Sequence, residues 1–182
     1  MKTQTFRSPV RIARGLSLLE CLITTCVAVT VLGSAAPGFQ QSLERRHLEG
    51  AAAQLETDLM AARSLAVARN QPLRVSFSRG AAGSCYVVHS GPAQSCDCQL
   101  PGPASCSAGS EAHASVFFKP AGPVQLQSNV GSIIFDPVKG TSTPAGTLRV
   151  VGRNGTAVHQ VVNIMGRVRS CAPQPLSGYA AC

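Results

Sequence analysis

The order of apolar and polar residues divides the chain into three parts. Residues 16–39 are almost continuously apolar, with Glu20 as the only charge, and an apolar run of roughly twenty residues can cross a bilayer as a helix. Residues 40–71 place apolar side chains at steps of three and four among charged ones, which predicts an amphipathic helix. After Pro72 apolar and polar residues alternate, which is typical of strands. We therefore expect an α+β chain in which a long N-terminal helix packs on a β-sheet-rich domain at 72–182.

The amphipathic part is expected to pack on this domain through one apolar stripe. Its members are Leu48, Ala52, Leu55, Leu59, Ala62 and Ala66. Pro37 is expected to kink the helix between its apolar and amphipathic halves, because proline removes a backbone hydrogen bond. The helix should end at Asn70-Gln71-Pro72, since the residue before a proline avoids the helical conformation.

The domain is expected to be a set of short strands joined by turns. The strand candidates are 73–78, 84–90, 114–120, 123–128, 132–137, 147–151 and 156–165. Asn154-Gly155, between the last two, suits a tight hairpin turn. Residues 91–113 have no period and predict a loop held by disulfides.

Six cysteines in the polar part of the chain indicate disulfides and an oxidising compartment. They are Cys85, Cys96, Cys98, Cys106, Cys171 and Cys182. We favour a Cys171–Cys182 bond, with the other four pairing among themselves. The alternative is a zinc site made of Cys96, Cys98 and the nearby His89 and His113. The one-residue gap between the first two differs from the spacing of most structural zinc sites, so we expect no metal and no other cofactor.

No pattern in the sequence predicts catalysis. His47, His89, His113 and His159 are scattered, and no nucleophile elbow, HExxH or phosphate-loop motif is present. We therefore expect no catalytic residues and no enzyme.

The N-terminus allows three interpretations. Residues 1–15 carry four cations and no acid, and such residues stay on the cytoplasmic side of a membrane helix. A secretory signal peptide cut after 34–36 is one interpretation, but Glu20 would lie in its apolar region and Pro37 would follow the cut. A signal anchor with a tolerated glutamate is the second. In the third, Gly15 before the apolar run, Glu20 five residues later and the proline resemble the leader of type IV prepilins and pseudopilins.

That resemblance implies a pathway for the chain. Cleavage by a prepilin peptidase after Gly15 and methylation of Leu16 are expected, although the family usually has Phe or Met there. Cleavage would lower the formal charge from +8 to +4, since residues 1–15 hold four cations. The chain would cross the bacterial inner membrane once, with its body in the periplasm. It would then join a surface-exposed pilus or pseudopilus of major and minor pilins, where Glu20 pairs with a neighbour's N-terminal amine.

Three further segments resemble the FimT/GspH group of minor pseudopilins. They are "ARSLAVARNQPLRVSF", "IIFDPVKGT" and "GRVRSC", in this order along the chain. The resemblance covers most of the chain, but residues 91–113 and the tail after Cys171 look individual. In FimT-like members a C-terminal GRxR element is associated with DNA binding in natural transformation, and here it falls on Gly166, Arg167 and Arg169.

The charge distribution agrees with this assignment. After Asp136 the last 46 residues hold five cations and no acid. With Val168 pointing inward, Arg167 and Arg169 would share one face about 6–7 Å apart. Gly166 would permit close backbone approach, and Arg149, Arg153 and Lys139 would extend the basic patch. The expected partner is DNA, bound weakly at its phosphates and with strong salt dependence. The alternatives are arginines that only keep the surface solvated, and a structural minor pseudopilin of pilus assembly or type II secretion.

Overall fold

The computed structural model describes residues 17–182, and the side chains of 34–37 lie outside this description. The chain divides between Gln41 and Ser42 into two compact units.

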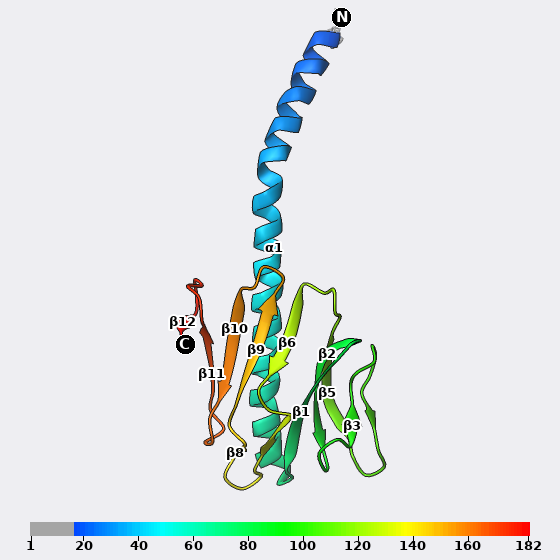
Figure 1. Ribbon diagram of the computed structural model, residues 1–182, viewed down its shortest axis with the longest axis vertical. Coiled ribbons are helices and arrows are strands. Elements are labelled where there is room, and N and C mark those ends of the chain that lie inside the picture. Colours follow the sequence, from blue (N-terminus) through cyan, green and yellow to red (C-terminus); the bar gives the residue numbers. More distant parts are fainter. Residues whose placement is uncertain (1–16) are drawn as a thin grey trace, which may run out of the picture. The chain divides into compact units, whose positions relative to one another are not determined.

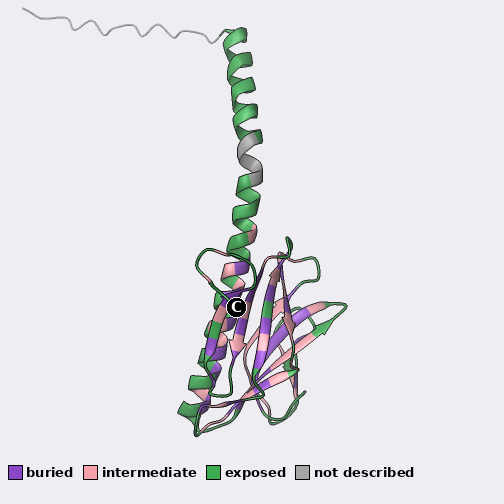
Figure 2. Ribbon diagram, turned by 60° about the vertical axis from the view of Figure 1, so that its left-hand side comes forward, coloured by how far each residue is buried: buried purple, intermediate pink, exposed green. Residues whose placement is uncertain are grey.

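The N-terminal unit is the first part of a single helix, α1 (Leu18–Arg69). Ser17 caps this helix, because its hydroxyl oxygen accepts a hydrogen bond from the Glu20 backbone N–H at 3.2 Å. Its described side chains up to residue 33 are exposed (Figure 2). By length and composition α1 can cross a membrane. The helix continues through Pro37, and the expected kink there stays a prediction.

The second part of α1 belongs to the body and ends where the sequence predicts. Asn70 adopts the left-handed conformation with φ 49°. Its N–H bonds the Val67 carbonyl at 3.2 Å, and the Gln71 N–H bonds the Ala66 carbonyl at 3.1 Å. This pair of bonds is the Schellman ending of a helix, with asparagine in the position that usually holds glycine.

The body contains two five-stranded sheets and a small hairpin (Figure 1). The first sheet has the order β5 (Ala112–Phe118), β2 (Gly83–Ser90), β1 (Leu73–Gly80), β7 (Ser132–Phe135) and β8 (Ser142–Thr143). The second has the order β12 (Ala180–Ala181), β11 (Val168–Ala172), β10 (Ala157–Val162), β9 (Gly146–Gly152) and β6 (Val124–Ser128). Strands β3 (Cys96–Asp97) and β4 (Ser105–Cys106) form the hairpin. All pairs are antiparallel except β11 with β12.

The C-terminal part of α1 packs across one face of the β11-β10-β9-β6 sheet (Figure 1). All six residues of the predicted stripe are at most 2% exposed, so the stripe is confirmed. Two polar contacts fix the helix on the strands. The buried Gln160 amide donates to the Ala52 carbonyl at 3.1 Å, and the Tyr86 hydroxyl donates to the Asp58 carboxylate at 2.6 Å. Burial and then the Asp58 contact raise the pKa of Tyr86, so this phenol stays protonated.

Three disulfides join the six cysteines of the body. Cys171–Cys182 is the pair that the sequence favours, and the other four form Cys85–Cys98 and Cys96–Cys106. The last two hold residues 91–113, the segment without a period, against the outer side of β2. The sulfur atoms that the zinc alternative requires at Cys96 and Cys98 are therefore in disulfide bonds.

A candidate nucleic-acid interface

The turn between β10 and β11 positions the first arginine of the GRxR element. Asn163 organises this turn, because its side-chain oxygen accepts hydrogen bonds from the backbone N–H groups of Met165 and Arg167 at 3.1 and 3.0 Å. The Asn163 N–H in turn bonds the Arg167 carbonyl at 3.1 Å. The β10–β11 pairing is thus extended by one step, and Arg167 is held at the end of β11. Sequence reasoning missed Asn163, although asparagine is a common turn-forming residue.

Gly166 has a different role from the one expected. It adopts φ +72°, and a Cβ atom there would lie 2.3 Å from the Gly140 carbonyl oxygen and 3.0 Å from Arg63 Nε. The residue is buried, so its backbone approaches another turn and not a ligand. Arg63 Nε donates to the same Gly140 oxygen at 2.8 Å. Gly166 therefore lets the turn at 163–167 pack against the turn that holds Gly140 and against Arg63 of α1.

Arg167 and Arg169 are exposed on either side of the buried Val168, as expected. A two-residue step along an extended strand is about 6–7 Å. Within residues 17–182, neither guanidinium has a side-chain hydrogen bond or an ion pair; the ion pair found there joins Arg45 to Glu49. Both side chains are thus available to an anion in solution.

Two carboxylates of α1 line the groove between the helix and β11 that Arg169 also borders. Arg169, Glu49 and Glu56 all border that groove. Glu49 is paired with Arg45 at 2.7 Å, and Glu56 accepts a hydrogen bond from the Ser170 hydroxyl on the helix-facing side of β11. These carboxylates therefore have other partners than Arg169.

Arg149 shares the outer face of the second sheet with Arg169. Arg149 on β9 pairs with His159 on β10, and His159 pairs with Cys171 on β11. Cys171 lies two residues after Arg169 on the same strand. Because paired positions and alternate residues point to the same side of a sheet, these side chains all face away from α1. Arg149 is exposed. Burial, and secondarily the Arg149 charge, lower the pKa of His159, so the imidazole is neutral at pH 7.

Arg153 is not part of this cluster. It lies in the β9–β10 turn, at the opposite end of β10 from Arg167, and six residues of strand span about 20 Å. Its guanidinium is already committed, because Nε donates to the Gly122 carbonyl at 3.2 Å and Nη2 to the Ala121 carbonyl. The extension of the patch to Arg153 therefore stays a prediction, and Arg153 is left out of the contacts considered below.

Lys139 does lie near Arg167. Both border a hollow of about 820 Å³ between the end of α1 and the turns at 138–140 and 166–168. The floor of this hollow is mostly apolar, with Met60, Val67 and Val138 exposed at 47%, 47% and 76%. The Lys139 turn is held by Asp136, whose carboxylate accepts the Val138 and Lys139 N–H groups at 2.9 and 2.7 Å. The hydrogen bond from the Lys139 N–H, and after it the one from the Val138 N–H, lower the pKa of Asp136.

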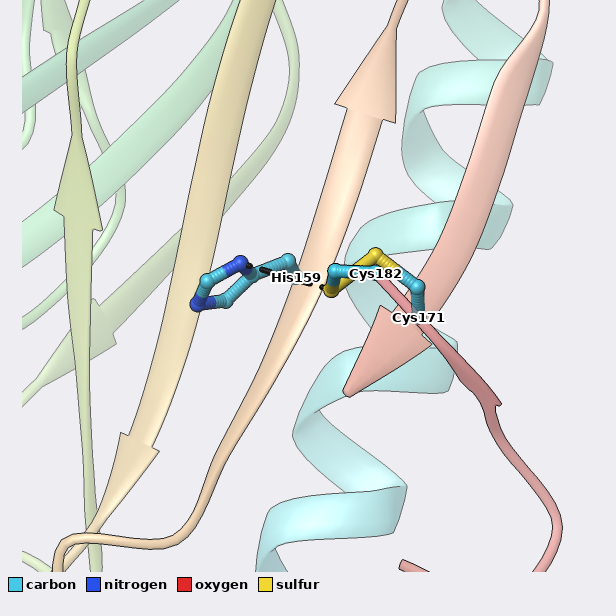
Figure 3. Close-up of side chains that lie close together, drawn as sticks. All are labelled: His159, Cys171 and Cys182. Atoms are coloured by element: carbon cyan, nitrogen blue, oxygen red, sulfur yellow. Dashed lines mark hydrogen bonds between the residues drawn. A yellow bond between two sulfur atoms is a disulfide. The ribbon is translucent and has the colours of Figure 1, made fainter. Parts of the chain in front are cut away.

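The C-terminal tail is fastened beside the basic face. Figure 3 shows the Cys171–Cys182 disulfide next to His159, whose Nδ1 lies 3.6 Å from Cys182 Sγ. One imidazole and two sulfurs within 4.8 Å resemble a metal-ligand set, but the two sulfurs are bonded to each other. The tail also pairs with β11 through β12, and Arg45 Nη2 donates to the Ser177 carbonyl at 2.9 Å.

The remaining predicted residues lie elsewhere. Gly15 and Leu16 fall outside the described residues. Glu20 is exposed in the first turn of α1, in the N-terminal unit. His89 is buried and bonds the Ser76 hydroxyl at 2.8 Å and the Ser90 carbonyl at 3.0 Å, which gives it a structural role in the first sheet.

Comparisons with known proteins agree with this architecture. The family described as Type II transport protein GspH matches residues 51–166. No curated protein matches the sequence. The type IV minor pilin FimU of Pseudomonas aeruginosa superposes with a TM-score of 0.52 at 20% identity, over 72% of this chain and 96% of that chain. The minor pseudopilin EpsH of the Vibrio cholerae type 2 secretion system gives 0.50 at 13% identity, over 70% of this chain and 98% of that chain.

The two structural likenesses show a pilin-like fold, in which a long N-terminal helix precedes antiparallel sheets. The family match covers more than half of the chain. The chain is therefore a member of the GspH family and a minor pilin or pseudopilin of the FimT/GspH type.

Proposed function

We propose that this minor pilin binds DNA without sequence preference and serves DNA uptake in natural transformation. One observation carries the proposal: Arg167 and Arg169 are both exposed, on either side of the buried Val168 where β11 begins, and neither has a carboxylate partner within the described chain. The proposed contacts are these two arginines, together with Arg149 and Lys139. Gly166 acts only by shaping the turn.

The chemistry of the arginine pair suits a phosphodiester backbone. A guanidinium is always charged and can make two parallel hydrogen bonds to phosphate oxygens. The strands of the second sheet carry no Asp or Glu, so no fixed negative charge on them opposes a polyanion. Contacts of this kind position a protein on DNA but do not read its sequence. With two to four phosphates neutralised, binding should be weak and should fall steeply with salt. Repetition of subunits in a filament would raise the avidity.

The N-terminal segment supplies the means of assembly in this proposal. A prepilin peptidase cuts after Gly15 and Leu16 is methylated. The apolar part of α1 holds the body in the periplasm at the inner membrane until the subunit enters a filament with other pilins. A carboxylate at bilayer depth is costly without a partner. We assign Glu20 to pairing with a neighbouring subunit's N-terminal amine.

A second function is favoured by the relatives themselves. The family is described by type II transport, and EpsH comes from a type 2 secretion system. A chain with that role would assemble with other pseudopilins and need no nucleic acid. The leader, helix and fold would be the same in both cases, so the basic surface distinguishes the two functions.

The test is a binding comparison between two double variants of equal charge. Residues 42–182 are used, because they hold all of the buried core and all three disulfides. Arg167→Ala/Arg169→Ala should shift a labelled duplex much less than the unmodified protein does, at both low and moderate salt. The control, Arg46→Ala/Arg69→Ala, removes two exposed charges from α1 and should bind normally. Equal binding by the two variants would leave the secretion role as the better account.

A further inference from the structure

A second basic feature borders the outer face, at the junction of the two sheets. A hollow of about 440 Å³ lies between β1, β6 and the turn at 129–131. Arg79 from the end of β1 and Arg149 from the middle of β9 both line it, and both are exposed. Arg79 belongs to the first sheet and Arg149 to the second. The two arginines therefore line one hollow only because the two sheets meet there.

The lining of the hollow suits an anion. Its remaining polar residues are Ser78, Gln127, Ser128 and Asn129, and no Asp or Glu is among the residues that line it. The Asn129 side-chain oxygen accepts the Thr147 N–H at 2.8 Å, which leaves its NH₂ group as a donor. The Gln127 amide has no hydrogen-bond partner among the described residues and is also a donor. Neither Arg79 nor Arg149 forms an ion pair in this part of the chain.

The hollow continues the surface that holds Arg169. Arg149 pairs in register with Gln127 on β6 and with His159 on β10, so all three side chains face outward. From β11 to β6 there are three strand intervals of about 4.8 Å, which give about 14 Å. Duplex DNA rises about 3.4 Å per nucleotide along each strand. One segment of about four base pairs therefore covers the distance from Arg169 to the hollow.

We propose that the Arg79–Arg149 hollow is a second phosphate-binding site for the same DNA molecule that Arg167 and Arg169 hold. This inference rests on the proposed function and makes Arg79 a new binding residue. DNA then lies across strands β11, β10, β9 and β6, and ends its contact at β1. The neutral His159 lies under this path and adds no charge at pH 7.

The experiment measures how the affinity for a labelled random duplex falls with salt, for residues 42–182 and for the full chain in non-ionic detergent. Each phosphate contact contributes about −0.9 to the slope of log K against log salt. With five contacts, from Arg79, Arg149, Arg167, Arg169 and Lys139, raising salt from about 50 to about 200 mM should weaken the unmodified body about 500-fold. Arg79→Ala/Arg149→Ala leaves three contacts, so its affinity should fall only about 40-fold over the same range.

Two further variants make the outcome decisive. Arg46→Ala/Arg69→Ala carries the same charge loss on α1 and should keep the dependence of about 500-fold. Arg79→Lys/Arg149→Lys keeps the charges and should restore most of the slope, which excludes a folding defect as the cause. If the Arg79→Ala/Arg149→Ala slope equals that of the control while Arg167→Ala/Arg169→Ala lowers it, the hollow and the Arg149 contact are refuted, and DNA binding through Arg167 and Arg169 stands. If neither arginine pair changes the slope, both are refuted.

Discussion

Gly166→Ala tests whether the glycine of the GRxR element serves the fold or the ligand. An L-residue in the left-handed region costs about 1–2 kcal/mol. The new Cβ would also lie 2.3 Å from the Gly140 carbonyl oxygen, a backbone atom that cannot rotate away. The two turns must therefore separate and weaken the Arg63–Gly140 hydrogen bond, whose loss costs about 0.5–1.5 kcal/mol. We expect a total loss of about 1.5–3.5 kcal/mol in the free energy of unfolding.

Gly155→Ala is the matched control for this variant. Gly155 has φ +80°, but nothing lies within 4 Å of its Cβ position. Only the conformational cost of about 1–2 kcal/mol should appear. Urea unfolding of residues 42–182 gives both values, and thermal midpoints should follow at about 2–4 °C per kcal/mol. If the two variants lose the same stability, the contact with Gly140 contributes nothing, and the role assigned to Gly166 is wrong.

Three other predictions concern the Cys171–Cys182 disulfide, the packing of α1 and the His159 imidazole. Cys171→Ser/Cys182→Ser opens a loop of sequence separation 11 and should lower the free energy of unfolding by about 3 kcal/mol on loop entropy; a loss below about 1 kcal/mol by urea unfolding would contradict this. Leu59→Ala, at a position 0% exposed, should cost about 2–5 kcal/mol by the same assay, and a smaller loss would mean that α1 packs loosely. Arg149→Ala should raise the pKa of His159 in an NMR titration, yet leave it below 6.5 because burial is the larger cause. Since the folded pKa lies below the unfolded one, stability should decline as pH falls through and below about 6.5; an unchanged or lowered pKa in the variant would contradict the placement of Arg149.

Local patterns in the sequence predict a large part of this fold. The apolar stripe of α1 follows from helical periodicity alone, and its six members are all buried. Asn70-Gln71-Pro72 ends the helix through the conformations that these residues prefer. Asn154-Gly155 forms the β9–β10 turn, where Gly155 takes a positive φ. The exposure of Arg167 and Arg169 beside Val168 follows from the alternation of a strand.

Other features depend on contacts between distant segments and could not be predicted. Strands of two residues, such as β8 and β12, are too short to show a period and exist only because they pair with β7 and β11. Gly166 is needed because Gly140 and Arg63 approach it. Arg153 looks free in the sequence but bonds carbonyl groups about thirty residues away. Arg79 reaches the basic face only because β1 and β6 meet.

The most direct test of DNA binding follows the arginine side chains themselves. Residues 42–182, labelled with ¹⁵N, are titrated with a short duplex while the Nε–Hε signals are recorded. We predict that the signals of Arg167 and Arg169 shift in a saturable way, while those of Arg46 and Arg69 on α1 stay in place. Shifts of similar size at all four arginines, or none at Arg167 and Arg169, would contradict the claim that this end of β11 binds DNA.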